Sequence, residues 1–334
     1  MIAPTGIRPA YKGTALFLLV FFCVSNHLAA QSSGYPDSLK HYNKAGLYGK
    51  ALPFAIKQYE ATKSRGKNDS THIAAIYDVG FDYYLTGNYD SAAVYFAAAC
   101  EGYKNLYGEK NANYTSSLTD LASAYKNTGK FKIAEELYLK TLSLKKEVAG
   151  ENDGYAVSLN QLGLLYLSLG RYSNAEDCFA RQYAIAKKLG EKTNAFARAA
   201  GTLSIVYARI GNYPRAEKLQ LQSLEIRRAL LGEKHPDYAL ALSNLGTLYG
   251  NTGNYVKADS VQTLALEITK ETLGETHPQY LRLLHNLGVN STNRKNYTAA
   301  EAFYKQALEG WKRVYGEDDP DYLFMFDALS NLYA

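Results

Sequence analysis

Residues 238–279 read YALALSNLGTLYGNTGNYVKADSVQTLALEITKETLGETHPQ, and the same pattern begins again directly afterwards. Leu245 and Tyr249 stand four residues apart, which places them on one face of a helix. Gly253 then marks a turn, and Tyr255 opens a second apolar run with helical spacing. This stretch therefore predicts one helix, a tight turn and a second helix.

Three linked positions of this unit recur along the chain. An aromatic residue follows the turn position by two residues, and an alanine follows it by five. The turn positions, spaced by 41 or 42 residues, are Gly46, Gly87, Gly129, Gly170, Gly211, Gly253 and Lys295; the aromatic positions are Tyr48, Tyr89, Phe131, Tyr172, Tyr213, Tyr255 and Tyr297; the alanines are Ala51, Ala92, Ala134, Ala175, Ala216, Ala258 and Ala300. Such a series establishes an internal repeat, which overrides a domain count based on length.

Each recurring position has an expected structural role. Glycine ends the first helix because only a residue without Cβ adopts a positive φ at little cost. Lys295 breaks this rule, so we expect a strained turn there, on the order of 1 kcal/mol less favourable. Each alanine is expected where the two helices cross, facing a small residue of the first helix. Those small residues are Gly80, Ala122, Gly163, Ser204, Gly246 and Gly288.

The links between repeats are regular as well. GEKHPDY at 232–238 returns as GETHPQY at 274–280 and as GEDDPDY at 316–322. The glycine is expected to close the second helix, and the proline suits the first turn of the next helix, where its missing N–H is no loss.

Together these motifs resemble a tetratricopeptide repeat in its longer form of about 42 residues, similar to the kinesin light chain family. The resemblance covers residues 36–334 and depends on three motifs. They are Leu-Gly-x-x-Tyr, Gly-x-Tyr with its alanine, and Gly-x-x-His-Pro-Asp. It implies an all-α fold, a right-handed superhelical solenoid of tandem helix-turn-helix hairpins, with seven repeats plus a first helix of an eighth. It also implies a scaffold that binds a protein or peptide.

The N-terminus has the pattern of a secretory signal peptide. Arg8 and Lys12 precede an apolar run at 14–25, and Ala29 and Ala30 provide small residues for cleavage. We therefore expect a signal peptide at 1–30, a short linker at 31–35 and an exported protein, periplasmic or secreted from a bacterium. The apolar run is short for a membrane span. An uncleaved N-terminal anchor is the alternative.

Composition and motifs point away from several functions. The formal charge of +5 is small for 334 residues, and no long Lys/Arg block indicates nucleic acid binding. Cys100 and Cys178 lie two repeats apart, so two buried free thiols are expected rather than a disulfide. No pattern of metal-ligand, phosphate-binding or activated-nucleophile residues is present. We predict no cofactor, no metal and no enzymatic activity.

The predicted binding surface lies on the first helices. In a stacked array these line the concave side, and residues not used in packing face the groove. Asn244 and Asn286 match the groove asparagines of tetratricopeptide domains through the resemblance, and Gln161 is a looser case. The full set of predicted groove residues is Asp78, Asp120, Gln161, Arg198, Arg209, Asn244, Asn251, Arg282, His285, Asn286 and Asn293. Its C-terminal half is basic and amide-rich, which suits a carboxylate or an acidic peptide.

The C-terminal segment, 322–334, repeats a first helix and carries an apolar face. We expect either a truncated chain, which we favour, or a face that is covered by another subunit. The leading functional hypothesis is a protein-interaction scaffold that holds an extended peptide. The alternative is the sensing or regulatory portion of a larger signalling or peptidase protein whose catalytic domain lies outside this sequence. Self-association through the last helix is a third possibility.

Overall fold

The structure, a computed structural model, describes Tyr42 and residues 48–66, 68–317 and 319–333. These residues belong to the unit formed by residues 35–334. The expected signal peptide, the linker and most of the first helix of the first repeat lie outside the described residues. Those three assignments stay predictions.

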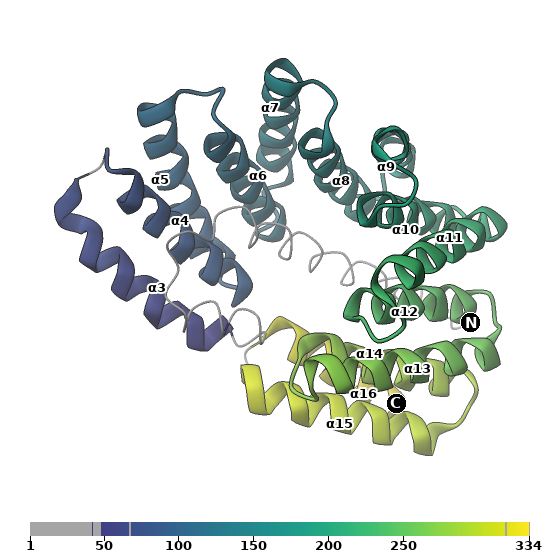
Figure 1. Cartoon of the computed structure of the whole chain (residues 1–334). Coiled ribbons are helices and arrows are strands. Elements are labelled where there is room, and N and C mark those ends of the chain that lie inside the picture. Colours follow the sequence, from purple (N-terminus) through teal and green to yellow (C-terminus); the bar gives the residue numbers. More distant parts are fainter. Residues whose placement is uncertain (1–41, 43–47, 67, 318, 334) are drawn as a thin grey trace, which may run out of the picture. The chain divides into compact units, whose positions relative to one another are not determined.

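The described residues form successive α-helices joined by short turns, and none of them lies in a β-strand. The helices are α3 (Tyr48–Thr62), α4 (Ser70–Leu85), α5 (Tyr89–Tyr107), α6 (Ala112–Asn127), α7 (Phe131–Ala149), α8 (Asp153–Ser168), α9 (Tyr172–Leu189), α10 (Asn194–Arg209), α11 (Tyr213–Leu231), α12 (Pro236–Asn251), α13 (Tyr255–Leu273), α14 (Pro278–Asn293), α15 (Tyr297–Tyr315) and α16 (Pro320–Tyr333), with a short 3-10 turn η2 (Lys63–Arg65) after α3. Even-numbered helices are the first helices of the repeats and odd-numbered helices are the second (Figure 1). The predicted solenoid of tandem helical hairpins is confirmed.

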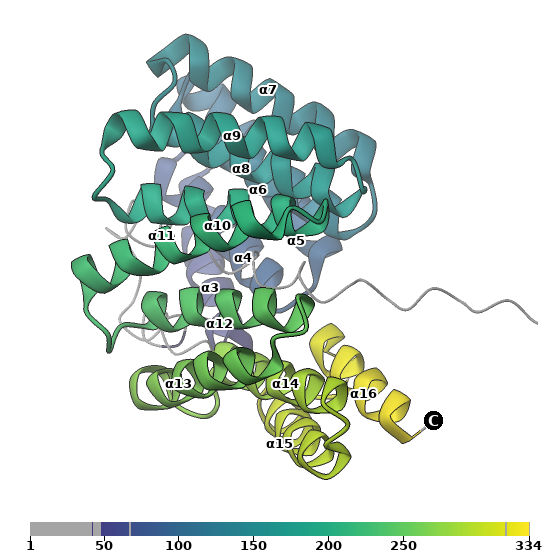
Figure 2. The same ribbon diagram turned by 90° about the vertical axis from the view of Figure 1, so that its right-hand side faces the viewer.

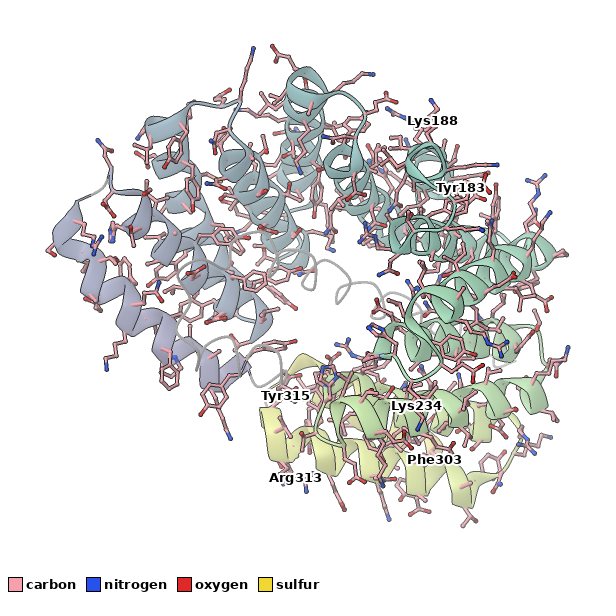
Figure 3. All side chains as sticks on the ribbon, in the orientation of Figure 1. Tyr183, Lys188, Lys234, Phe303, Arg313 and Tyr315 are labelled. Atoms are coloured by element: carbon pink, nitrogen blue, oxygen red, sulfur yellow. The ribbon has the colours of Figure 1, made fainter. Side chains whose placement is uncertain are left out.

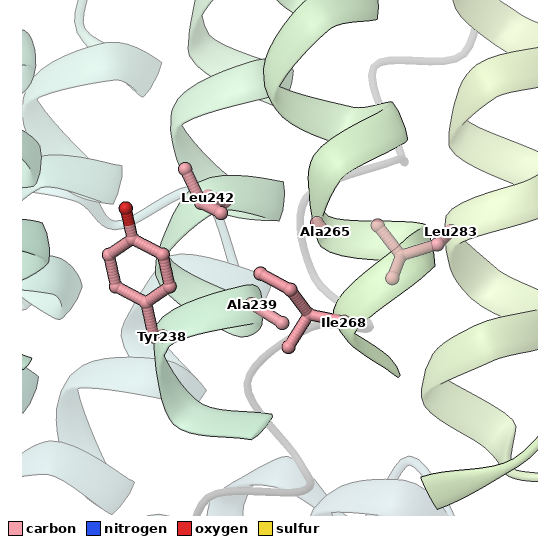
Figure 4. Close-up of a cluster of buried hydrophobic side chains, with 6 residues drawn as sticks. All are labelled: Tyr238, Ala239, Leu242, Ala265, Ile268 and Leu283. Atoms are coloured by element: carbon pink, nitrogen blue, oxygen red, sulfur yellow. The ribbon is translucent and has the colours of Figure 1, made fainter. Parts of the chain in front are cut away.

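Each hairpin buries its apolar side against the next one. Tyr238, Ala239 and Leu242 on α12 pack with Ala265 and Ile268 on α13, and Leu283 on α14 completes the cluster (Figure 4). One cluster thus joins two successive repeats. Because this contact is made between sequence neighbours, the array is stabilised mainly by nearest-neighbour interfaces.

The first helices also contact one another directly, α4 with α6 and so on to α14 with α16. Consecutive second helices of the described part make no comparable contact. The stack therefore bends toward its first helices, which lie side by side along one face (Figures 1 and 2). We call the exposed side of α4, α6, α8, α10, α12, α14 and α16 the first-helix face.

The turn between the two helices of a hairpin has the expected geometry. Gly253 adopts φ 78°, and the N–H of the next residue, Asn254, donates to the carbonyl of Tyr249 at 2.8 Å. Lys295 adopts the same left-handed conformation, with φ 60°, and is the non-glycine residue with positive φ among the described residues. The strained turn predicted at Lys295 is therefore confirmed.

Replacing Lys295 with glycine is expected to stabilise the C-terminal repeats by about 0.5–1 kcal/mol. An L-residue pays roughly 1–2 kcal/mol in this conformation, and the extra backbone freedom of unfolded glycine offsets part of the gain. Urea unfolding followed by fluorescence of Trp311, the single tryptophan of the chain, measures the change. Lys295→Ala is the matched control, because it keeps Cβ and should gain nothing. Equal stabilisation by both variants would contradict the explanation.

The expected pairing of alanine with a small residue at the helix crossing is wrong. A Cβ added to Gly163 would lie 2.6 Å from a ring atom of Phe179, and one added to Gly288 would lie 2.5 Å from Tyr304. Phe179 and Tyr304 stand four residues after the alanines Ala175 and Ala300. The small residue of the first helix thus makes room for a large side chain of the second. The alanines themselves are fully buried.

The links form caps at both helix ends. Gly274 ends α13 with φ 85°, and Lys270 pairs with Glu275 of the link at 2.5 Å. His277 is the N-cap of α14, because its Nδ1 accepts a hydrogen bond from the backbone N–H of Gln279 at 3.2 Å. His235 caps α12 in the same way. In other repeats this position holds the more usual cap residues Asp69, Asn111, Asn152 and Thr193.

Candidate functional site

The predicted groove residues come from six successive first helices. Asp78 lies on α4, Asp120 on α6, Gln161 on α8, Arg198 and Arg209 on α10, Asn244 and Asn251 on α12, and Arg282, His285, Asn286 and Asn293 on α14. By contrast, Lys188 on α9 and Arg313 on α15 point away from the first helices (Figure 3). The repeat register thus places the predicted residues at recurring positions of successive first helices.

These residues differ in how far solvent reaches them. Asp78, Gln161 and His285 are buried, whereas Asn251 and Asn293 are exposed. The remaining residues, Asp120, Arg198, Arg209, Asn244, Arg282 and Asn286, are half-buried. A buried side chain cannot meet a ligand without a movement of its neighbours, so the half-buried and exposed residues are the better candidates. Their role in binding stays a prediction.

Hydrogen bonds between neighbouring first helices occupy the N-terminal part of the face. The Tyr77 hydroxyl donates to the Asp120 carboxylate at 2.6 Å, and the Asn127 amide donates to the Tyr84 hydroxyl at 3.0 Å. Both bonds join one repeat to the next. Asp120 therefore has a structural role that its sequence position did not reveal.

Arg282 is held by its surroundings on α14. Its guanidinium pairs with Asp321 of α16 at 2.5 Å and lies 5.6 Å from the centre of the Trp311 ring. Both side chains of the ion pair are largely buried. The negative charge of Asp321 thus compensates the positive charge of Arg282, which was expected to make the C-terminal half of the groove basic.

The charges of two arginines, Arg198 on α10 and Arg227 on α11, act on each other, and Arg227 was missed in the sequence. Arg198 is half-buried and lies 3.9 Å from the Asp153 carboxylate. Arg227 on the second helix α11 is buried and donates to the backbone carbonyl of Asp237 at 2.9 Å. Burial lowers the pKa of Arg227 to about 10, and the nearby charge of Arg198 acts in the same direction. The corresponding positions hold Tyr103, Lys145, Ala186, Thr269 and Trp311, and Lys145 contacts the equivalent carbonyl of Gly154, so residue type alone gave no clear signal.

His285 is enclosed rather than presented to a ligand. Its ring lies 5.0 Å from the ring of Phe324 and 5.6 Å from the ring of Tyr304. Burial lowers its pKa to about 4. His285 is therefore neutral near pH 7 and adds no positive charge to the face.

No other chemistry stands out in the described part of the chain. Its His, Cys, Asp and Glu side chains form no group of three that could hold a metal ion. Cys100 and Cys178 are free and buried, as predicted, and burial raises the pKa of each thiol to about 12. Both thiols therefore stay protonated and weakly nucleophilic.

No helix among those the structure describes has both the length and the apolar character that crossing a bilayer requires.

Known structures share this architecture. BtubC (BKLC) of P. vanneervenii is 22% identical over 68% of this chain and 92% of that chain, with a TM-score of 0.57. A Rap protein in complex with competence and sporulation factor is 13% identical over 92% of this chain and 90% of that chain, with a TM-score of 0.60. A structure described as the nearly identical TPR-like repeats of a putative kinesin light chain of Podosopora anserina is 22% identical over 59% of this chain and 94% of that chain, with a TM-score of 0.49.

A comparison with curated protein sequences found no match. Family models described as tetratricopeptide repeat match residues 72–147, 114–188, 195–268 and 240–290, and a further model of the same description matches residues 281–321. These segments cover more than half of the chain, and the hairpins follow the same register. The chain belongs to the tetratricopeptide repeat family.

Proposed function

We propose that this protein is an interaction scaffold that holds an extended peptide along its first-helix face. The observation that carries the proposal is the repetition of an amide side chain at one register position, Asn244 on α12 and Asn286 on α14, both half-buried. Packed helices stand roughly 8–10 Å apart, which matches about three residues of an extended chain. Successive repeats could therefore bind every third residue of one peptide.

The half of the face around α10 and α12 suits an acidic residue in that peptide. Arg198 is half-buried, and its contact with the Asp153 carboxylate is long at 3.9 Å. Arg227 is buried, so it contributes nearby positive charge and no direct contact. Guanidinium groups bind carboxylates through charge-assisted hydrogen bonds. Asn244 and the exposed Asn251 supply neutral donors and acceptors one repeat further along. We expect the bound segment to place a carboxylate beside Arg198.

The double variant Asn244→Ala/Arg198→Ala is expected to lower the affinity for such peptides at least tenfold. Each lost hydrogen bond costs about 0.5–1.5 kcal/mol, and more when a charged group takes part. Peptides selected by display on the purified chain serve as ligands, and isothermal titration measures their affinity. Arg282 is left unchanged because it stabilises the contact with Asp321.

The matched control for the groove variant is Asn174→Ala/Lys218→Ala, on the second helices α9 and α11, where both side chains are exposed. It should bind the selected peptides as the unchanged protein does. Circular dichroism should report the same helix content for all three proteins. Equal binding by the groove variant would rule out the first-helix face as the binding surface.

A further inference from the structure

Basic residues are concentrated at one end of the hairpins. Five of the turns within hairpins, taken from three residues before to four after the turn position, hold nine Lys or Arg and no Asp or Glu. We call these residues the turn edge: 126–133, 167–174, 208–215, 250–257 and 292–299. The chain has 37 Lys or Arg and 32 Asp or Glu, so 28 basic residues remain elsewhere against all 32 acidic ones. The positive formal charge therefore comes from the turn edge.

The first described turn, residues 84–91, is different. It holds Asp90 and neither Lys nor Arg. The basic edge thus extends from the turn between α6 and α7 to the turn between α14 and α15.

Much of this charge is open to solvent and uncompensated. Lys132, Arg215, Lys257 and Lys295 are exposed, and within the described part of the chain none of these four lies in an ion pair. The guanidinium of Arg215 lies 5.5 Å from the centre of the Tyr207 ring, a contact that orients it and leaves its charge in place. The turn edge therefore presents positive charge in four of its five turns.

Contacts between hairpins bring successive turns side by side. Arg171 pairs with Glu135 of α7 at 3.0 Å, and Arg294 pairs with Asp259 of α13. Each of these acids belongs to the second helix of the preceding hairpin and stands six residues after its turn position. Each second helix also packs on the first helix that follows it. The turns thus form one continuous edge of the array.

Apolar side chains share this edge. The aromatic position after the turn is exposed at Phe131, Tyr172, Tyr213 and Tyr297, and in the remaining turn Val256 is 73% exposed. A single exposed apolar residue is ordinary on a protein surface. Here one recurs in every turn of the edge, beside an exposed Lys or Arg.

We propose that the turn edge docks this protein onto the surface of an anionic lipid bilayer. Lys and Arg attract anionic headgroups, and aromatic rings favour the boundary between headgroups and acyl chains. Nucleic acid and acidic polysaccharide would meet the same charges. The exposed aliphatic side chains Ile133, Ile210 and Val256 favour the bilayer, because its acyl boundary removes them from water.

This docking is independent of peptide binding. None of the residues changed in the tests below belongs to the predicted groove. Loss of one activity therefore leaves the other to be measured.

A fluorescent label at position 256 tests the proposal. In the full-length variant Cys23→Ser/Val256→Cys, the new cysteine is the thiol that an environment-sensitive dye reaches, because Cys100 and Cys178 are buried. Phosphatidylcholine vesicles with about 30% phosphatidylglycerol should shift the dye emission to shorter wavelength, whereas pure phosphatidylcholine vesicles should not. The matched label is Cys23→Ser/Leu230→Cys. Leu230 is exposed at the other end of α11, roughly 25 Å from its turn, and its dye should not respond.

Removing the charge of the turn edge should weaken the response. The variant Lys132→Ser/Arg215→Ser/Lys257→Ser, made in the chain labelled at position 256, loses three exposed cations. Each cation near an anionic surface contributes about fivefold in affinity. At least tenfold more anionic lipid should therefore be needed for half of the emission shift.

The charge-matched control removes the same residue types from the link end of the hairpins. Lys188→Ser/Lys192→Ser/Arg313→Ser changes three exposed cations and should respond like the chain with unchanged charges. Circular dichroism should report the same helix content for every variant. No shift on anionic vesicles, an equal shift at Leu230, or equal lipid requirements for the two triple variants would overturn the proposal. An equal shift with an oligonucleotide or polygalacturonate at the same concentration of negative charge would overturn the choice of a bilayer.

Discussion

Replacing Gly163 with alanine is expected to destabilise the array by about 2 kcal/mol, although alanine is the better helix former. The added Cβ would lie 2.6 Å from one ring atom of Phe179 and 2.9 Å from two others. Carbon atoms in contact prefer about 3.5–4.0 Å. Phe179 is fully buried, so its ring cannot move aside without disturbing α8, α9 and their neighbours. Urea unfolding followed by circular dichroism measures the loss.

A matched glycine on another first helix separates steric conflict from helix propensity. Gly250 on α12 has open space around its Cβ position, so Gly250→Ala should stabilise the array by about 0.5–1 kcal/mol. The double variant Gly163→Ala/Phe179→Leu should recover part of the loss, because leucine leaves more room than the phenyl ring. Stabilisation by Gly163→Ala would show that the two helices do not approach as closely as the structure indicates.

Lowering the pH from 7 to 5 is expected to destabilise the C-terminal repeats by about 2 kcal/mol for each of two histidines. Burial lowers the pKa of His277 and His285 from 6.5 to about 4, and the charge of Arg282 adds to the effect at His277. Below pH 6.5 the unfolded chain binds a proton at each imidazole, while the folded chain does not until about pH 4. Stability is therefore complete above pH 6.5 and is lost as the pH falls toward 4.

Each histidine has a structural reason to resist protonation. The unprotonated Nδ1 of His277 accepts the cap hydrogen bond from Gln279, and a proton there would remove the acceptor. His285 is enclosed by the rings of Tyr304 and Phe324, and a charge there would be poorly solvated. Trp311 fluorescence during urea unfolding reports on these repeats, because Trp311 packs with Tyr280, Leu281 and Leu284 of α14.

The double variant His277→Asn/His285→Phe provides the control for the pH effect. Asparagine keeps an N-cap acceptor and phenylalanine keeps an aromatic ring, but neither titrates. Asp319 has the opposite effect on stability as the pH falls. Burial raises the pKa of its carboxyl group, so the folded chain binds this proton at a higher pH than the unfolded chain does. The variant retains Asp319, so it should lose most of the pH dependence between 7 and 5. An unchanged pH dependence would mean that the histidines are not the cause.

Much of the fold could be predicted because each hairpin is a local structure. The turn glycines, the strained Lys295, the helix-closing glycines of the links and the two buried thiols all follow from residue type and spacing. The expectation for the helix crossing was wrong because it placed the alanine of the second helix against the small residue of the first helix. In the structure a large side chain of the second helix, such as Phe179, lies against that small residue, such as Gly163. The histidine caps were missed because Asp, Asn, Ser and Thr are the usual residues at that position.

The candidate site was less predictable because its side chains interact across repeats. Spacing placed the predicted residues on the first helices, but it could not tell that His285 is enclosed by aromatic rings or that Arg282 pairs with Asp321. Arg227 was missed because it reaches the region from a second helix. These contacts depend on how the next hairpin is placed, which sequence spacing does not specify.

The sequence by itself determined the repeat, its register and the helix pairs, because turns and helix faces depend on residues that are close in the chain. Only the tertiary structure decided which polar residues stay accessible and which arginines are paired with a carboxylate. The reason is physical: burial and charge pairing depend on side chains that belong to different hairpins, and they are fixed only when the hairpins stack.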